Sequence, residues 1–290
     1  MKLEQLSLPS PFVKKSNDFV RSRVNFNNVL SGRILASFIS LIDKSDVDFK
    51  EYAIPATSVL VKGTGGKAYQ ELKESCRILA NALVERKMSG VDSFSFSPIF
   101  MKIGYDHGII YGKFSPEIKD LLLQYKGRFT QYNLTEYMQM QSAYSQRMFE
   151  IVKSYASMKI MVVEIEDLHR MLDTPPSLRK SFKDFRVRVL DRAHADINGS
   201  TSVHFYWEPI YIKRKVRRIK FIFDNSMSGK LLQETTTSID SPIVIDECSF
   251  CWSEKKRLSE PCAVRLTKNH KGIEKCQQCL MKYPVDNFGA

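Results

Sequence analysis

The segment Ser177–Asn198 limits the possible folds of this chain more than any other stretch. Its apolar residues recur at helical spacing, which predicts an amphipathic helix with one buried face. That face comprises Leu178, Phe182, Phe185, Val189, Ala193 and Ile197. Beside it runs a row of cations: Arg179, Lys180, Lys183 and Arg186. A packing helix with a solvated basic flank is the simpler interpretation, and a helix that contacts a polyanion is the functional one.

The neighbouring segments favour the functional interpretation. A short helix is expected over Ile165–Leu172, and the residues Asp173-Thr174-Pro175-Pro176 then predict a tight turn. Two alternating strands follow the basic helix, around Val203–Trp207 and Val216–Phe223. Helix, turn, basic helix and hairpin is the order of a winged helix-turn-helix, in which the second helix enters a DNA major groove.

The overall charge agrees with a nucleic-acid partner. The chain of 290 residues has 44 Lys or Arg against 32 Asp or Glu, a formal net charge of +12. Such an excess attracts polyanions, of which nucleic acid is the most common in the cytosol. No apolar run approaches the roughly 18 residues of a membrane span, and the first residues lack the apolar core of a secretion signal. We therefore expect a cytoplasmic protein with no membrane partner.

An earlier part of the chain repeats the basic helix and its hairpin at an offset of 113 residues. A helix is predicted over Lys67–Lys87, and a hairpin over Phe94–Ile103 and Ile109–Phe114. The matching apolar pairs are Tyr69 with Phe182, Leu72 with Phe185, Cys76 with Val189, and Ala80 with Ala193. The matching polar pairs are Lys67 with Lys180, Gln70 with Lys183, and Lys73 with Arg186. This correspondence predicts a duplicated winged-helix domain that is more basic in its second copy.

A long helix is predicted between the two copies, over Thr135–Ala156, with Thr135 as its N-cap. A further helix is expected over Asn28–Asp43. The glycine-rich turn Gly63–Lys67 resembles a phosphate-binding loop but lacks its first glycine and its Ser or Thr, so nucleotide hydrolysis is not indicated. The histidines include no His-x-His pair of the kind a nicking enzyme uses, and we expect no enzymatic activity.

Five of the six cysteines lie close to the C-terminus and predict a metal site. Cys248 and Cys251 form one C-x2-C pair, and Cys276 and Cys279 form a second after 24 residues. Two such pairs provide the four thiolates of a structural Zn²⁺ site, so we expect a small zinc-ribbon-like module. Unliganded thiols are the alternative, and Cys262 and His270 are spare ligands. A metal-dependent nuclease with this module as its centre is the alternative function from another class.

Four segments resemble the replication initiators of iteron-bearing plasmids, a family built from two winged-helix domains. They are KKSNDFVRSRVNF (Lys14–Phe26), AYQELKESCRILANALVERK (Ala68–Lys87), LTEYMQMQSAYSQRMFEIVKSY (Leu134–Tyr155) and FKDFRVRVLDRAHADIN (Phe182–Asn198) with the hairpin to Phe223. The resemblance spans residues 14–223, and family members usually end soon after the second hairpin. It therefore gives no information about the cysteine-rich end.

The resemblance implies a protein that binds repeated double-stranded origin sites, promotes opening of the origin and recruits the host replicative helicase. The host initiator protein and a second copy of the chain are the further partners it implies, and it places the cytoplasmic protein on plasmid or nucleoid DNA. It places the DNA-reading residues of the second domain at Arg179, Lys180, Lys183 and Arg186. The corresponding candidates in the first domain are Lys67, Gln70, Lys73 and Arg77. A transcriptional repressor, or an initiator that represses its own gene as a dimer, is compatible with the same fold.

The expected class is therefore α+β, with two tandem winged helix-turn-helix domains and a small zinc-ribbon-like module. The expected organisation is a flexible tail over 1–13, a first winged-helix domain over 14–130 and a second over 131–223. A polar linker over 224–247 and the cysteine-rich module over 248–290 complete the chain.

Overall fold

The computed structural model describes residues 11–43, 45–60, 66–87, 93–123 and 128–223, with two short strands further on. The chain divides into a unit over Met1–Leu232 and a unit over Gln233–Ala290. In the second unit the described elements are β12 (Leu266–Lys268) and β13 (Glu274–Cys276), which pair antiparallel. The predicted zinc ligands Cys248, Cys251 and Cys279 lie outside the described residues. The fourth, Cys276, ends β13.

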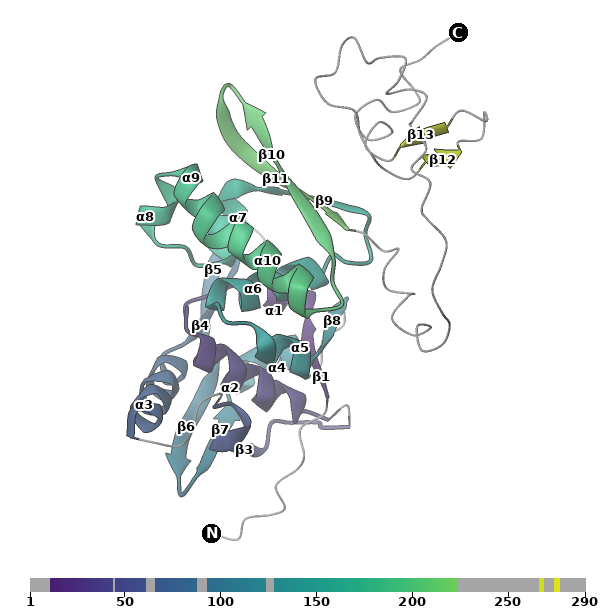
Figure 1. The fold of residues 1–290 in the computed structure, drawn as a ribbon. Coiled ribbons are helices and arrows are strands. Elements are labelled where there is room, and N and C mark those ends of the chain that lie inside the picture. Colours follow the sequence, from purple (N-terminus) through teal and green to yellow (C-terminus); the bar gives the residue numbers. More distant parts are fainter. Residues whose placement is uncertain are drawn as a thin grey trace. The chain divides into compact units, whose positions relative to one another are not determined.

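The first unit contains two domains in tandem (Figure 1). The elements of the first are β1 (Phe12–Ser16), α1 (Asn17–Arg21), β2 (Arg23–Val24), α2 (Val29–Ser40), β3 (Glu51–Pro55), η1 (Ala56–Ser58), α3 (Gly66–Ala80), β4 (Leu83–Lys87), β5 (Phe94–Pro98), β6 (Phe100–Asp106), β7 (Ile109–Phe114), η2 (Pro116–Ile118), α4 (Lys119–Leu122) and β8 (Phe129–Asn133). Those of the second are α5 (Leu134–Gln139), α6 (Ala143–Lys153), β9 (Ile160–Glu164), α7 (Ile165–Met171), α8 (Pro176–Arg179), α9 (Phe182–Phe185), the π-helical turn η3 (Arg186–Asp191), α10 (Arg192–Ser200), β10 (Phe205–Ile212) and β11 (Lys215–Phe223).

The two domains share one topology. In the first, α2, β3, η1 and α3 are followed by the hairpin β6–β7, and the sheet order is β3-β7-β6. In the second, α6, β9, α7 and α8–α10 are followed by the hairpin β10–β11, and the sheet order is β10-β11-β9. In both sheets the last strand lies in the middle and pairs antiparallel with its two neighbours. This is the winged-helix arrangement, present twice.

The first domain carries an insertion that the repeat in the sequence did not reveal. The helix predicted over Lys67–Lys87 ends at Ala80, and the chain continues as the strand β4. β4 pairs with β5 on one side and with the two-residue strand β2 on the other. Leu83 fits helical spacing but lies in this strand, where Val84 provides the buried contact. Tyr69, predicted to be buried, is 47% exposed and its ring packs on that of Tyr105.

The helix predicted over Thr135–Ala156 is two helices. α5 begins after Asn133, whose side chain accepts the backbone N–H of Thr135 at 2.7 Å, so Asn133 is the N-cap and Thr135 is not. The backbone is extended at Met140, and α6 begins after Ser142. The predicted apolar side is nevertheless correct at Met140 and at Ile151, which are both buried.

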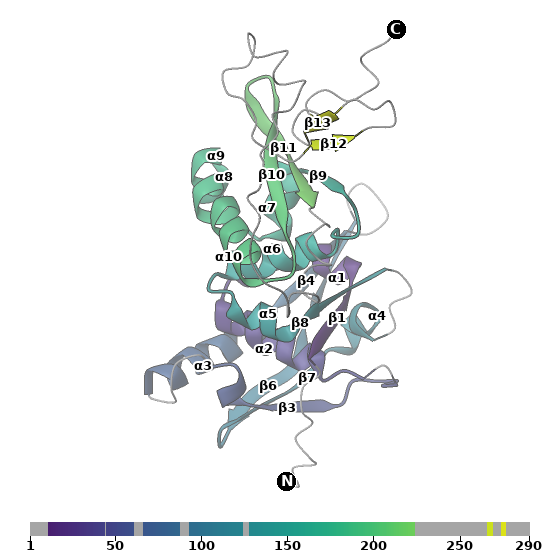
Figure 2. The ribbon, with the colours of Figure 1, turned by 45° about the vertical axis from the view of Figure 1, so that its right-hand side comes forward.

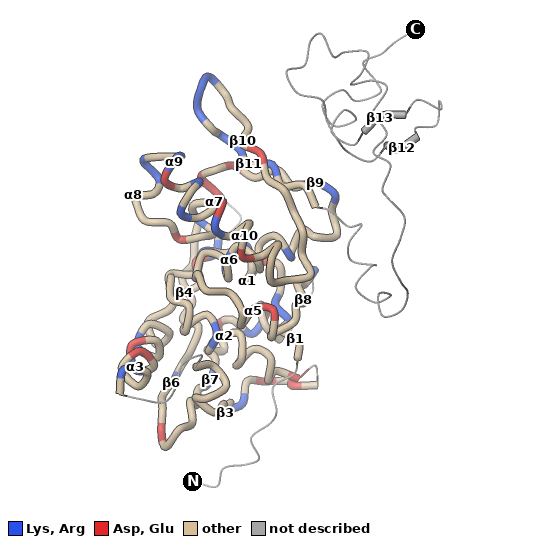
Figure 3. The backbone as a smooth tube through the Cα atoms, in the orientation of Figure 1, with Lys and Arg blue, Asp and Glu red and all other residues tan. Residues whose placement is uncertain are grey.

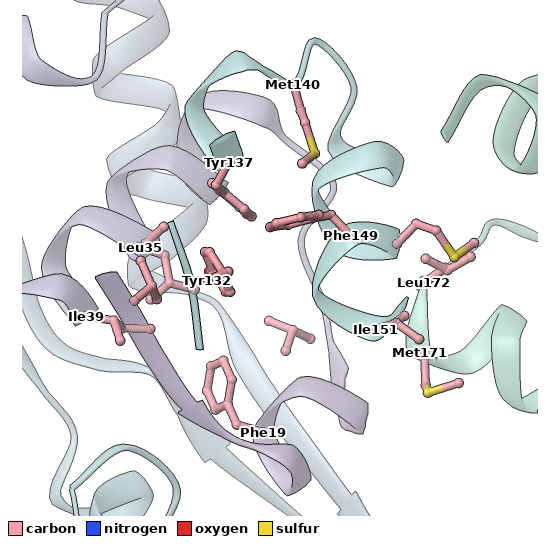
Figure 4. Packing of buried hydrophobic residues seen from close by; sticks show 14 of the residues in the cluster. Phe19, Leu35, Ile39, Tyr132, Tyr137, Met140, Phe149, Ile151, Met171 and Leu172 are labelled. Atoms are coloured by element: carbon pink, nitrogen blue, oxygen red, sulfur yellow. The ribbon is translucent and has the colours of Figure 1, made fainter. Parts of the chain in front are cut away.

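One continuous core joins the two domains. Tyr132 of β8 stacks on Tyr137 of α5 with 5.4 Å between ring centroids, and its edge contacts Phe149 of α6 at 5.3 Å (Figure 4). The buried apolar cluster continues from these rings to Leu35 on one side and Met171 on the other. Because this packing crosses the domain boundary, the two winged-helix domains form one compact unit with a shared core. Within the described residues, no helix is long and apolar enough to cross a membrane.

Candidate nucleic-acid interface

The basic segment of the second domain is helical but interrupted. α8 is a single short turn, and Ser181 then caps α9 by accepting the backbone N–H of Asp184. From Phe182 to Ser200 the helix is continuous, with a wider π-helical turn at its centre. Most of the predicted apolar face is buried: Phe185 and Val189 are fully inaccessible to solvent, whereas Phe182 is only partly buried. The opposite face is therefore available to a ligand.

All four predicted DNA-reading residues of the second domain are exposed, and two of them have partners within the protein. The Nε of Arg179 donates to the backbone oxygen of Thr174 at 2.8 Å, which fixes its stem against the preceding turn. Arg186 lies 3.2 Å from Asp191 and its guanidinium lies over the ring of Trp207. The sequence interpretation missed Arg188, which is also exposed although it follows Arg186 by only two residues.

The turn between α7 and α8 is held by side chains from several elements. Asp173 has a φ of +47°, in the left-handed region that asparagine and aspartate tolerate better than most residues. Next to it, the Oγ1 of Thr174 lies 2.8 Å from Nδ1 of the buried His169. Burial lowers the pKa of His169, and the charge of Glu166 offsets only part of that shift. The ring is therefore neutral near pH 7.

The hairpin of the second domain provides a further cationic surface that the sequence interpretation did not single out. Figures 1 and 2 show β10–β11 extending past the helices, and Figure 3 shows blue cationic positions at its tip. The residues Phe205–Phe223 include six Lys or Arg and one Glu, a net charge of +5. Lys213 and Arg214 form the two-residue turn, both with positive φ, at +46° and +63°. The run KRKVRR over 213–218 was the sequence signal for this surface.

The helix of the first domain that corresponds to the basic segment, α3, carries less positive charge. Its candidates Lys67, Gln70, Lys73 and Arg77 are exposed on α3. However, Arg77 forms an ion pair with Glu74, at 2.6 Å between Nη2 and Oε1, and Glu71 adds another negative charge. The helix has a net charge of only +1, against +3 for Pro176–Ser200. Figure 3 shows red acidic positions on α3 and at the tip of β6–β7.

The two helices flank a shared groove of about 900 Å³. Its walls include Glu71 and Glu74 of α3, Tyr144 of α6 and Arg192 of α10. Figures 1 and 2 both place α3 and α8–α10 on the same side of the unit. α3 and α8–α10 therefore lie on one side of the unit, with the groove between them.

The acidic residues near α7 do not form a metal site. Glu164 accepts a hydrogen bond from Arg218 at 2.5 Å, and Glu166 and Asp167 lie in the first turn of α7, where carboxylates interact favourably with the helix dipole. Among the described residues no group of three His, Cys, Asp or Glu is placed to hold a metal ion. Cys76 is buried as predicted, and burial raises the pKa of its thiol to about 11.

Taken together, a twin winged-helix body with a cationic helix and hairpin defines a DNA-binding protein. The family comparisons make the assignment more specific. A model described as "Initiator Replication protein, WH1" matches residues 12–153, and one described as "Initiator Rep protein, WH2" matches residues 164–223. The chain belongs to this family of plasmid replication initiators.

No curated protein matches the chain. Among solved structures, the crystal structure of RctB domains 2–3 (RctB-155-483) is similar, with 12% sequence identity and a TM-score of 0.38. That match covers 69% of this chain and 82% of the other.

Proposed function

We propose that this initiator binds repeated origin sites, or iterons, and that its second domain selects the sequence. The continuous helix from α9 to α10 enters the major groove, where its Lys183 and Arg186, together with Lys180 just before it, reach base edges and phosphates. The hairpin turn Lys213–Arg214 then contacts the flanking backbone. α3 of the first domain meets the same duplex on the same side and makes weaker contacts.

A single observation supports this division of roles more than any other. The helix and hairpin of the second domain carry strong positive charge on exposed faces, whereas the equivalent elements of the first are nearly neutral. Because phosphate neutralisation provides most of the affinity of such proteins, the more cationic helix and hairpin dominate binding. Base contacts from the same helix then provide the discrimination.

The test begins with duplexes that tile the DNA flanking the coding sequence. Fluorescence anisotropy at fixed salt should identify duplexes with direct repeats that bind at least 10³-fold more tightly than scrambled duplexes of equal length. Lys183→Ala with Arg186→Ala should abolish this preference while circular dichroism stays unchanged. Wild-type preference in the double variant would exclude this helix as the reader.

We include origin opening, recruitment of the host helicase and host initiator protein, and autorepression by a dimer in the same proposal, which family membership supports. A minimal plasmid bearing the bound repeats should replicate only when the protein is supplied. If the protein represses a promoter at these repeats but supports no replication, the transcriptional repressor is the better description. Sedimentation with and without the repeat duplex measures the balance between monomer and dimer.

We further propose that Cys248, Cys251, Cys276 and Cys279 bind structural Zn²⁺. The proposal is supported by their spacing, since two C-x2-C pairs supply a complete tetrahedral thiolate set. Metal analysis of the purified full chain should give one zinc per chain, and Cys251→Ser should remove it. Cys262→Ser is the matched control and should retain the metal.

The protein is proposed to act without catalysis. The described residues contain no clustered histidines and carboxylates suited to phosphodiester cleavage. Incubation of supercoiled plasmid with the protein and Mg²⁺ or Mn²⁺ should leave it uncut. Nicking that disappears in His270→Ala would instead establish the nuclease alternative.

A further inference from the structure

Arg23 of β2 connects the first domain to the helix-turn-helix of the second. Its Nε lies 2.7 Å from Oδ1 of Asp173, in the turn between α7 and α8. Its Nη1 lies 3.0 Å from Oε2 of Glu85, on the inserted strand β4. The three side chains are 39%, 21% and 22% exposed, so the cluster lies between surface and core. The guanidinium of Arg23 therefore joins β4 to the turn between α7 and α8, which are far apart in the sequence.

The turn that Arg23 holds determines where α8 begins. Asp173 has left-handed backbone geometry, and the next residue, Thr174, interacts with His169 and accepts a hydrogen bond from Arg179. α8 follows after Pro175. A shift of the Asp173 side chain would therefore change the entry angle of α8 and of the helix that follows it, which carry the exposed Arg179, Lys183 and Arg186.

A second arginine ties the same two segments, but through the backbone. Arg147 of α6 donates to the backbone oxygens of Ser22 and Met171, at 2.5 and 3.2 Å. Ser22 immediately precedes Arg23, and Met171 lies two residues before Asp173. Because Arg147 binds main-chain atoms, it holds the segments together. Arg23 binds side chains, so it fixes the position of the turn relative to β4.

We propose that Arg23 is a positioning residue for DNA reading: by holding Asp173 against Glu85 it sets the angle at which α8–α10 meets the duplex, without contacting DNA itself. The proposal rests on the proposed sequence reading by the second domain. It also assigns a role to the inserted hairpin, which provides Glu85 as the fixed point in the first domain.

Asp173→Asn separates this proposal from simple electrostatics. Asparagine tolerates the positive φ, so the turn itself is preserved. Removing a negative charge next to a DNA-binding helix should strengthen binding if charge alone matters. The positioning role predicts the opposite, because the asparagine amide is a weaker partner for Arg23.

The experiment measures affinity for the repeat duplex identified by tiling, over a series of salt concentrations. Arg23→Gln and Asp173→Asn should each weaken specific binding by roughly 3- to 10-fold, and the double variant should lose no more than either alone. The slope of log K against log salt should not change, since no phosphate contact is lost. Arg86→Gln is the matched control: it breaks a 2.7 Å ion pair with Asp120 within the first domain and should bind like the wild type.

The proposal would be overturned if Asp173→Asn bound the repeat duplex as tightly as the wild type or more tightly, or if the losses of affinity added in the double variant. It would also be overturned if the slope of log K against log salt fell by about one phosphate contact in Arg23→Gln. Arg23→Lys should recover part of the affinity, which guards against a variant that merely folds poorly. A wild-type protein without preference for any duplex would contradict the proposed function instead. The two failures are thus distinguishable.

Discussion

Lys15 and Glu150 form an ion pair in the centre of the molecule, with 2.5 Å between Lys15 Nζ and Glu150 Oε1 and only 2% and 3% of the two side chains exposed. The pair joins β1 to α6. Glu150 also accepts hydrogen bonds from the Tyr132 hydroxyl at 2.6 Å and from Arg147 Nη1 at 3.0 Å. Burial acts to raise the pKa of the Glu150 carboxyl, but the charges of Lys15 and Arg147 outweigh it and keep the pKa below its usual value.

Removing one member of this pair should be far more costly than removing both. Glu150→Gln leaves the Lys15 ammonium buried without a counter-charge and should lower the free energy of unfolding by about 3–5 kcal/mol. Lys15→Met combined with Glu150→Gln should recover much of that loss, because neither charge remains buried. Urea denaturation of Glu150→Gln, Lys15→Met and the double variant measures the difference, and a double variant as unstable as the sum of the single variants would contradict it.

His169 should make the helix-turn-helix sensitive to acid. Its pKa in the folded protein is below the ordinary value of 6.5, so the unfolded chain binds a proton more readily than the folded one. Stability therefore rises with pH across that window, and is lost as pH falls from about 6.5 through the lowered folded value. His169→Gln, which cannot titrate, should flatten this part of the stability profile. Thermal unfolding between pH 5 and 8 measures this. If the stabilities of the variant and the wild type fall in parallel as the pH is lowered, His169 is not the cause of the acid sensitivity.

The sequence predicts the repeated fold well where the buried face of a helix can be recognised from the spacing of neighbouring apolar residues. Leu72 and Phe185 were paired by the offset of the two copies, and both are buried in equivalent helices. It fails where helical and strand spacing overlap. Leu83 continues the helical stripe of α3 but lies in β4, because pairing with β2 and β5 overrides the local pattern. At Met140 the apolar residues keep their helical spacing, although the backbone there is extended and separates α5 from α6.

The sequence predicts the candidate site less completely than the fold, because the type of a charged residue does not show which side chain it pairs with. Lys183 is exposed as its place on the helix implies, but the ion pair of Arg77 with Glu74 appears only when the neighbouring side chains are placed. Arg23 reads as one cation in a basic N-terminal segment, and its contact with Asp173 spans 150 residues. No local pattern could reveal that contact, since it depends on how two domains pack.

The second domain should dominate DNA binding. Lys183→Ala and Arg186→Ala should each weaken binding to the repeat duplex by roughly 5- to 150-fold, the range expected for loss of one good base contact. The equivalent first-domain changes, Lys73→Ala and Arg77→Ala, should cost only a few-fold, because α3 is nearly neutral and Arg77 is engaged with Glu74. Anisotropy titrations at one salt concentration give the comparison. Equal losses from the two helices would show that both domains read the sequence.

The tip of the β10–β11 hairpin should show a conflict between stability and binding. Lys213 and Arg214 occupy two successive left-handed positions, where the hairpin of the first domain uses His107 and Gly108. Asparagine and glycine are the favoured pair in such a turn. Left-handed geometry costs a residue other than glycine about 1–2 kcal/mol. The cationic tip is therefore present despite its conformational cost.

Lys213→Asn with Arg214→Gly tests this conflict directly. Thermal unfolding should show a gain in stability on the order of 1 kcal/mol, because the turn strain is relieved. Affinity for any duplex should fall, and the slope of log K against log salt should decrease by up to about two phosphate contacts. The preference for the repeat duplex over a scrambled one should persist, since base reading belongs to the helix. Lys220→Gln, on the same hairpin but away from its tip, is the control. A stabilised variant with an unchanged salt slope would place the hairpin tip away from the DNA.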